Sequence, residues 1–406
     1  MTETLEEPYA ALRISVVCGD RGIAAAGRGG ASEHLRSMCA GFLSLGAEVE
    51  LWCQRLSPGG SVPDAPLPTG LVTLESPRGR LPGALRKYPP WDHAIDANAM
   101  SHWLLRQGKR FRPDVVYERF SMFSSPGVRV ARRLGIPYVV ELNAPLVWEA
   151  ALFRGLAARP AFIRREARAL TRADLLICVS PALREYAISR GVEPSRIVVV
   201  PNGASAVHPR SLLSRTKAEK SKAKDAFVLG YAGSFKAWQG LVSSKEQLLE
   251  LRAAVSPRTL HLDLWGDGPE RALFAAGVLE EDGITLSLHG WGSAEQLACA
   301  RASWDAAWVP LAPWPPAFST DGRSLEELEA SFGEAAPSLY FSPLKEAEAR
   351  RAGLDVWPEV AAPMPQEPPR SWQQIAEVVL SATGFPPRSP RGKMYAATTA
   401  DPQASA

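Results

Sequence analysis

The sequence is poor in cysteine, and its five cysteines form no pair with the spacing of a metal-binding or redox motif. They are scattered over the chain as Cys18, Cys39, Cys53, Cys178 and Cys299. An odd number of cysteines without C-x-x-C spacing is typical of small buried residues in a reducing compartment. The pattern therefore excludes a disulfide framework and predicts no metal site built on cysteine.

Long apolar runs are also missing. No stretch approaches the ~18 consecutive apolar residues of a membrane-spanning helix. The N-terminal segment MTETLEEPYA lacks the apolar core of a signal peptide. We therefore expect a cytoplasmic protein.

An excess of charge and the common nucleotide-binding motifs are absent as well. The formal net charge is +3, too small to indicate nucleic acid as a partner, and no helix-turn-helix, zinc-finger or aromatic–basic RNA motif occurs. The first strand-to-helix turn has no G-x-G-x-x-G, and no Tyr-x-x-x-Lys pair lies at a suitable site. These absences argue against a dinucleotide-dependent epimerase or dehydrogenase.

What the chain does contain is a repeated alternation of strands and helices. At 46% hydrophobic residues, 406 residues are enough for two ordinary cores. Alternating strands and helices are typical of doubly wound α/β domains with parallel sheets. The expected strands are 12–18, 49–53, 114–117, 136–142, 174–179, 196–200, 227–231, 259–265, 284–289 and 305–309. The clearest expected helices are 35–45, 158–172, 181–190, 244–254, 269–279, 293–302, 344–352 and 371–382.

A break in this alternation divides the chain. Residues 204–225 are rich in Ser, Lys and Arg, lack apolar periodicity, and are typical of a solvated linker. The predicted organisation is a first α/β domain over 1–203, a linker over 204–225, a second α/β domain over 226–357, a proline-rich segment with a closing helix over 358–385, and a disordered tail over 386–406.

Six motifs occur in the order found in one known family. They are GRGGASEHLRSMCAGFLSLGAEVEL, PDVVYERFSMFSSPGVRVARRLGIPYVVELNAPLVWE, RADLLICVSPALREYAISRGVEPSRIVVVPNGA, LGYAGSFKAWQG, LWGDGPER and YFSPLKEAE. The chain thereby resembles glycosyltransferase family 4-like proteins from about residue 12 to about residue 353. The order of the motifs over that length is more specific than any single motif.

This resemblance implies a GT-B-like fold, in which two doubly wound, Rossmann-like domains face each other across a cleft. Such enzymes transfer a sugar from a nucleotide-sugar to an acceptor, commonly with retention and without an essential metal. The implied partners are a nucleotide-sugar donor and a glycan, lipid-linked or secondary-metabolite acceptor, with no other cofactor and no nucleic acid. The chain has no Asp-x-Asp pair, which agrees with metal independence because such pairs hold a divalent cation on a diphosphate.

The resemblance points to two groups of residues in the first domain. Gly29 and Gly30 lie in the loop that, in the family, approaches the acceptor and the reacting sugar. Glycine lets the backbone approach a ligand and exposes amide donors; a tight turn is the structural alternative. Glu141 and Asn143 lie at a strand end in ELNAPLVWE, near the transferred sugar in relatives, where Asn143 would hold the sugar through its amide. Capping is the alternative role for Glu141.

The donor side is implied by two glycine-containing loops. In GSFKAWQG, which runs from Gly233 to Gly240, Ser234 and Gln239 occupy the positions where many relatives carry an arginine and a lysine against the diphosphate. Lys236 is the expected compensating cation. The turn Gly266-Asp267-Gly268 flanks the nucleotide base in relatives, although a simple turn explains it equally well.

The third donor motif is YFSPLK. By resemblance Ser342, Pro343, Leu344 and Lys345 belong to the phosphate-binding segment, with Lys345 stabilising the leaving diphosphate. Glu348 corresponds to the second glutamate of the family's Glu-x7-Glu, which binds the ribose, whereas Tyr340 stands at the position of the first. An exposed helix residue is the alternative for Glu348.

The chain departs from the family after Gly353. Relatives continue with a strand and a glycine-containing loop that covers the diphosphate, but this sequence reads LDVWPEVAAPMPQEPPRSW. Several donor-domain elements are thus predicted to be deleted or replaced. A catalytically inactive scaffold, or a partner subunit of another glycosyltransferase, is therefore the alternative to an enzyme.

A basic helix face raises the question of membrane contact. Arg164, Arg165, Arg168 and Arg172 have spacings that place them on one face of a helix. Such a face would be attracted to anionic lipid, and family members often contact membranes to reach lipid-linked acceptors. A solvated helix face explains the spacing equally well.

Overall fold

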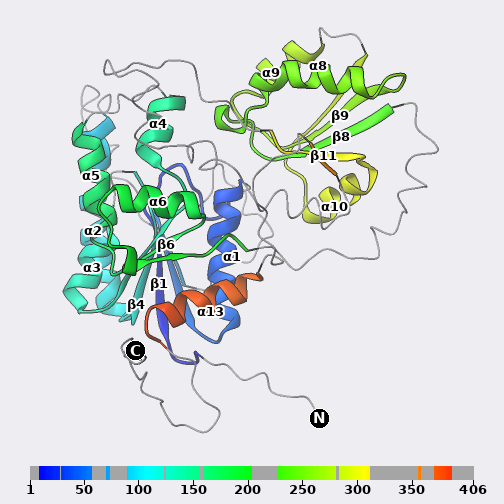
Figure 1. Cartoon of the computed structure of the whole chain (residues 1–406). Coiled ribbons are helices and arrows are strands. Elements are labelled where there is room, and N and C mark those ends of the chain that lie inside the picture. The colour runs from blue at the N-terminus through cyan, green and yellow to red at the C-terminus, as the bar shows by residue number, and fades with distance from the viewer. Residues whose placement is uncertain are drawn as a thin grey trace, which may run out of the picture.

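The computed structural model contains two parallel β-sheets, each in its own α/β domain (Figure 1). The structure describes residues 9–27, 29–56, 70–73, 89–122, 125–154, 160–203, 226–279, 283–310, 355–357 and 370–385. The strand order is β3-β2-β1-β4-β5-β6-β7 in the first sheet and β10-β9-β8-β11-β12 in the second. The α/β class predicted from the alternating elements is confirmed.

The first sheet is organised around its central strand β1. β1 (Arg13–Cys18) pairs in parallel with both β2 and β4. Ile14 and Val16 contribute to the apolar core on one face, and Val17 contributes to the core on the other, as expected for a parallel strand buried on both sides. The other strands are β2 (Glu48–Cys53), β3 (Gly70–Thr73), β4 (Val115–Arg119), β5 (Tyr138–Leu142), β6 (Leu175–Cys178) and β7 (Ile197–Val199).

Six helices belong to the described part of this domain. They are α1 (Gly30–Ser44), α2 (Pro89–Phe111), α3 (Gly127–Leu134), α4 (Leu146–Arg154), α5 (Pro160–Leu170) and α6 (Pro181–Ser189). Sequence patterns did not predict the helices α2 and α4 or the short strand β3. α2 begins with two prolines and carries many polar residues, so its helical period is weak, although proline is well tolerated in the first turn of a helix.

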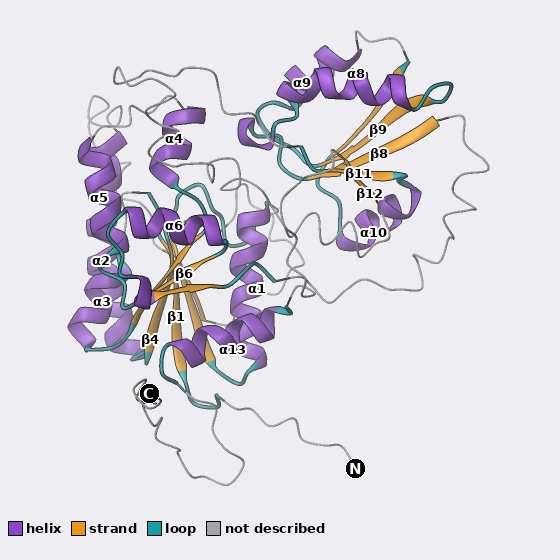
Figure 2. Cartoon of the chain, in the orientation of Figure 1, coloured by secondary structure: helices purple, strands orange, loops and turns teal. Residues whose placement is uncertain are grey.

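The last described helix, α13 (Trp372–Ala382), packs on α1 of the first domain (Figure 2). Its residues Ile375, Ala376, Val379 and Leu380 complete the same apolar core as β1 and α1. Ser371 begins the helix with a capping box, because its hydroxyl accepts the backbone N–H of Gln374. A segment more than 150 residues beyond the first sheet in sequence thus covers one of its faces.

Glycine allows the two helices to approach at backbone distance. A Cβ atom added to Gly41 would lie 2.4 Å from the carbonyl oxygen of Trp372. We therefore predict that Gly41→Ala displaces α13 and lowers the free energy of unfolding by about 1–3 kcal/mol. Chemical denaturation measures this change.

Gly277 in the helix α9 (Arg271–Leu279) of the second domain provides the matched control. A Cβ atom added there meets nothing within 4 Å. Gly277→Ala should stabilise the protein by about 0.5–1 kcal/mol through helix propensity alone. Equal effects of the two substitutions would contradict the proposed contact.

The second sheet is smaller and is covered by different helices on its two faces. Its strands are β8 (Ala226–Ala232), β9 (Thr259–Trp265), β10 (Ile284–His289), β11 (Ala306–Trp308) and β12 (Asp355–Trp357). α8 (Lys245–Ala254) and α9 (Arg271–Leu279) lie on one face, and α10 (Ala294–Ser303) lies on the other (Figure 1).

The strand β12 corrects the expectation that the strand following Gly353 in relatives is lost. Residues 355–357 pair in parallel with β11, with Ala306 opposite Asp355. Three residues followed by a proline-rich segment are too few to show a period, so only pairing with β11 defines them as a strand. The predicted linker 204–225, helix 344–352, most of the proline-rich segment and the tail 386–406 lie outside the described residues.

Candidate functional site

A buried ionic cluster joins α1 to the carboxyl ends of β4 and β5. Glu141 of β5 lies in register beside Arg119, the last residue of β4. One carboxylate oxygen of Glu141 lies 2.6 Å from Nε2 of His34 on α1, and the other lies 3.7 Å from Nη1 of Arg119. The side chains of His34 and Glu141 are 8% and 5% exposed, so this carboxylate is shielded from solvent by its partners.

The cluster keeps Glu141 ionised. Burial by itself would raise the pKa of this carboxyl, but attraction to His34 and Arg119 and hydrogen bonds from His34 and Asn143 outweigh it and lower the pKa to about 2. Burial, and after it the charge of this carboxylate, raises the pKa of the Tyr117 hydroxyl. Glu141 is therefore a fixed negative charge beside His34 of α1, and Asn143, the second predicted residue of this strand end, follows it two positions later.

The predicted Gly29 and Gly30 form the start of α1 above this cluster. Gly29 is the N-cap residue with an extended backbone, and Gly30 is the first helical residue. An added Cβ atom at either position meets nothing within 4 Å, so packing among the described residues does not require glycine here. Among the described residues, space for a ligand is therefore left beside this helix N-terminus.

Arg36 holds the loop that leads into α1. Its Nη1 donates to the carbonyl oxygens of Ala25 at 2.8 Å and Gly27 at 2.7 Å, and its Nη2 lies 2.6 Å from Glu33. The guanidinium thereby holds the glycine-rich loop through the backbone carbonyl groups of that loop. Sequence analysis missed Arg36, His34 and Arg119. A signal was available for His34, since it lies four residues before Met38 on the buried side of the helix.

Acid titration tests the charge of Glu141. Lowering its pKa from 4.5 to about 2 contributes about 3 kcal/mol to folding at neutral pH. This contribution is complete above about pH 4.5 and is lost as the pH falls through about 2. We predict that Glu141→Gln is less stable than the unsubstituted protein at pH 7 and that the two stabilities converge near pH 2.

Unfolding free energies measured with urea from pH 7 to pH 2 provide this test. Glu185→Gln is the control, because Glu185 is an exposed residue of α6. The control should follow the unsubstituted protein at every pH. Parallel curves for Glu141→Gln and the unsubstituted protein would show that the cluster does not stabilise the ionised carboxylate.

In the second domain, the two predicted donor loops pack against each other by their backbones. Gly233 N–H donates to the carbonyl of Trp265 at 2.9 Å, and Phe235 N–H donates to that of Asp267 at 3.1 Å. Gly266 has a φ of +130°, and an added Cβ atom would lie 1.8 Å from the carbonyl oxygen of Gly233. Close contact of the two loops therefore explains this glycine without a ligand.

Gly268 is explained in the same way. An added Cβ atom there would lie 2.5 Å from the carbonyl oxygen of Phe235. We predict that Gly268→Ala separates the two loops and lowers the melting temperature by several degrees, about what a loss of 1–3 kcal/mol produces. Gly290, where an added Cβ atom meets nothing within 4 Å, is the control; an unchanged melting temperature for Gly268→Ala would contradict the packing role.

The remaining residues of the first donor loop differ in exposure. The hydroxyl of the buried Tyr231 donates to the backbone carbonyl of Ser234 at 2.8 Å and lies 3.4 Å from the side-chain oxygen of Gln239. Lys236 is exposed. The loop therefore presents one cation, while Gln239 is partly engaged by the core.

The third donor motif lies outside the described residues. This applies to Ser342, Pro343, Leu344, Lys345 and Glu348, and also to Tyr340. Within the described residues, no group of three or more His, Cys, Asp or Glu side chains is arranged to hold a metal ion.

The basic residues considered for membrane contact lie on α5 and directly after it. Arg164, Arg168 and Arg172 are exposed, whereas partial burial lowers the pKa of Arg165. In the part of the chain that the structure describes, no helix combines the length and apolarity of a membrane span.

Comparison with known proteins identifies both the first domain and the fold. Residues 29–203 match the glycosyl transferase 4-like domain, and the comparison with curated proteins gives no match. Sucrose-phosphate synthase from Thermosynechococcus elongatus is similar over 85% of this chain and 80% of its own, with 15% identity and a TM-score of 0.56.

Two further similar structures were solved with nucleotides. Anabaena HepE, in complex with UDP-glucose, matches 91% of this chain and 100% of its own, with 15% identity and a TM-score of 0.51. The catalytic domain of starch synthase IV from Arabidopsis thaliana, bound to ADP and acarbose, covers 92% of both chains, with 12% identity and a TM-score of 0.51. At these identities the likeness establishes the GT-B fold.

Proposed function

We propose that this chain, whose residues 29–203 match the glycosyl transferase 4-like domain, is a glycosyltransferase. It moves a sugar, with retention, from a nucleotide-sugar to a glycan, lipid-linked or secondary-metabolite acceptor. The observation that carries the proposal is the cluster at the carboxyl edge of the first sheet. There an open helix N-terminus and Asn143 lie on a fixed ionic support, and ligands of doubly wound sheets bind at this edge.

The proposed roles follow from the contacts of each residue. Asn143 contacts a hydroxyl of the transferred sugar, while Glu141, held by His34 and Arg119, keeps the asparagine in place. The backbone at Gly29 and Gly30, where an added Cβ atom meets nothing within 4 Å among the described residues, approaches the reacting sugar. Lys236, exposed on the loop after β8, stabilises the leaving diphosphate together with Lys345. Catalysis on these terms is positioning and electrostatic stabilisation.

Calorimetry against a panel of nucleoside diphosphates and nucleotide-sugars tests donor binding. We expect one nucleotide to bind with micromolar affinity and Lys236→Ala to weaken it about tenfold, the effect of losing about 1.4 kcal/mol of charge-assisted contact. Lys109→Ala, which removes an exposed lysine from the end of α2, is the control of equal charge. An equal loss of nucleotide affinity in both variants would show that only the net charge of the protein affects binding.

A second measurement tests the first domain. Once a donor is known, Asn143→Ala should lower the rate of donor hydrolysis or transfer by at least about tenfold while donor affinity stays unchanged, because a contact to the reacting sugar acts on turnover. A loss of donor affinity with normal turnover would contradict the role of Asn143.

One observation favours the alternative of an inactive scaffold or partner subunit. The positions that carry cations in many relatives are the neutral Ser234 and Gln239, and both are contacted by Tyr231 from the core. If the folded protein binds no nucleotide of the panel, this alternative replaces the enzyme. Co-purification with an intact glycosyltransferase would then identify the partner.

A further inference from the structure

The second sheet has an apolar face toward α8 and α9. On its opposite face, polar side chains lie beside a small apolar cluster of Val228, Trp304, Ala307 and Val309. The leucines of β9 pack toward α8 and α9 in an apolar core, and strict alternation along β9 and β10 directs polar or amphipathic side chains to the opposite face. Parallel sheets of α/β proteins are normally apolar on both faces, so this face departs from an ordinary helix-covered surface. The side chains in question are His261, Asp263, Trp265, Thr285, Ser287 and His289.

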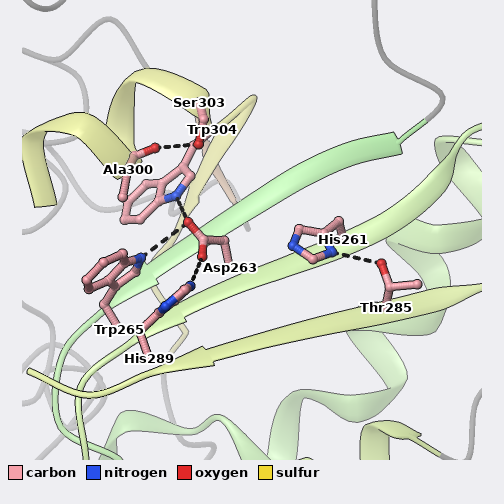
Figure 3. A network of polar contacts seen from close by, with 8 residues as sticks. All are labelled: His261, Asp263, Trp265, Thr285, His289, Ala300, Ser303 and Trp304. Carbon is pink, nitrogen blue, oxygen red and sulfur yellow. Dashed lines mark hydrogen bonds and ion pairs between the residues drawn. The ribbon is translucent and has the colours of Figure 1, made fainter. Parts of the chain in front are cut away.

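Asp263 is the centre of this face (Figure 3). One carboxylate oxygen accepts the indole N–H of Trp304 at 2.6 Å and that of Trp265 at 3.3 Å, and the other lies 2.8 Å from Nε2 of His289. Trp304 reaches Asp263 by lying across Gly230, where an added Cβ atom would lie 1.7 Å from the indole ring. The carboxylate therefore fixes the orientation of three aromatic side chains.

His289 is held but still accessible. Its ring stacks on Trp265, with 4.1 Å between ring centroids and an angle of 17°, and 39% of its side chain is exposed. Because Nε2 is engaged by Asp263, the second ring nitrogen, Nδ1, is left to accept or donate a hydrogen bond to a ligand.

An open hollow of about 660 Å³ lies between this face and one side of α10, a volume in the range of small-molecule sites. His261, Trp265 and His289 line it from the sheet, and Glu295, Cys299 and Ser303 line it from the helix. Among the described residues, its lining includes two carboxylates and neither lysine nor arginine. Such a lining disfavours phosphates and carboxylates as ligands, since these anions are bound by cationic donors.

We propose that this hollow binds a neutral carbohydrate. Sugar hydroxyls can donate to the carboxylate of Glu295 and to the oxygen of Ser303, whose own hydrogen is donated to the carbonyl of Ala300. They can also bond the free ring nitrogen of His289, and the apolar face of a sugar ring can pack against the rings of Trp265 and His289. The site is distinct from the loops proposed to hold the nucleotide diphosphate, and it does not depend on transferase activity.

Cys299 supplies a direct readout of occupancy. It is exposed and lines the hollow, whereas the other four cysteines are buried. The full-length protein is treated with iodoacetamide in the presence of maltotriose, chitotriose and other neutral oligosaccharides, and the labelling rate of Cys299 is followed by mass spectrometry. We expect at least one neutral oligosaccharide to slow the labelling in a saturable way, and UDP and glucuronic acid to leave it unchanged.

Two variants locate the contact. His289→Ala should weaken binding of the protecting sugar about tenfold, as expected for the loss of one to two hydrogen bonds. In this variant Asp263 keeps the hydrogen bonds from both indole N–H groups. Glu295→Gln on α10 should weaken it as well. Glu250→Gln, on an exposed position of α8 across the sheet, should leave the affinity unchanged.

Three results would overturn the proposal: no neutral oligosaccharide protects Cys299, UDP protects it as well as the sugar does, or His289→Ala binds the sugar as tightly as the unsubstituted protein. Because nucleotide binding is measured separately by calorimetry, failure here is distinguishable from failure of the proposed glycosyltransferase activity. Melting temperatures of the three variants show whether each one is folded.

Discussion

The contact between α1 and α13 is the constraint on which the first domain depends. Its core requires apolar cover on both faces of a seven-stranded parallel sheet, and α13 supplies part of that cover from the far end of the chain. The fit is backbone to backbone at Gly41, and the Trp372 side chain also lies against Gly203, a short way after β7. The first turn of α13 thus contacts both α1 and the segment that follows the last strand of this sheet.

The same contact supports the candidate site. Trp372 meets the ring of His34 edge to face, with 4.9 Å between centroids, and His34 in turn pairs with Glu141. The carboxylate of Glu141 stays ionised in the core only because packing holds its partners in place. A buried carboxylate without such partners would take up a proton. Glu118, buried on the neighbouring strand, illustrates the contrast. It accepts hydrogen bonds from the Tyr138 hydroxyl and the Gly127 N–H, and burial raises its pKa to about 8.

The second domain is organised by close backbone contact on one side and by hydrogen bonding on the other. Gly266 and Gly268 let the loops after β8 and β9 touch, so that these loops form one unit at the carboxyl edge of the sheet. Across the sheet, Asp263 ties β9, β10 and the end of α10 together through His289 and Trp304. This face is therefore held both by a hydrogen-bonded carboxylate and by a small apolar cluster of Val228, Trp304, Ala307 and Val309.

The sequence by itself determined the α/β class, the order of the long strands and helices, and the loops that carry Gly29, Asn143 and Gly233. These features follow from the local spacing of apolar residues and from residues typical of turns, both of which act over a few positions along the chain. The partners of Glu141 and Asp263, the short strand β12 and the position of α13 were decided only by the tertiary structure. His34 and Glu141 are 107 positions apart and Asp263 and Trp304 are 41 apart, so no local pattern links them. They meet because parallel strands bring distant segments to one edge and because buried polar groups must find partners there.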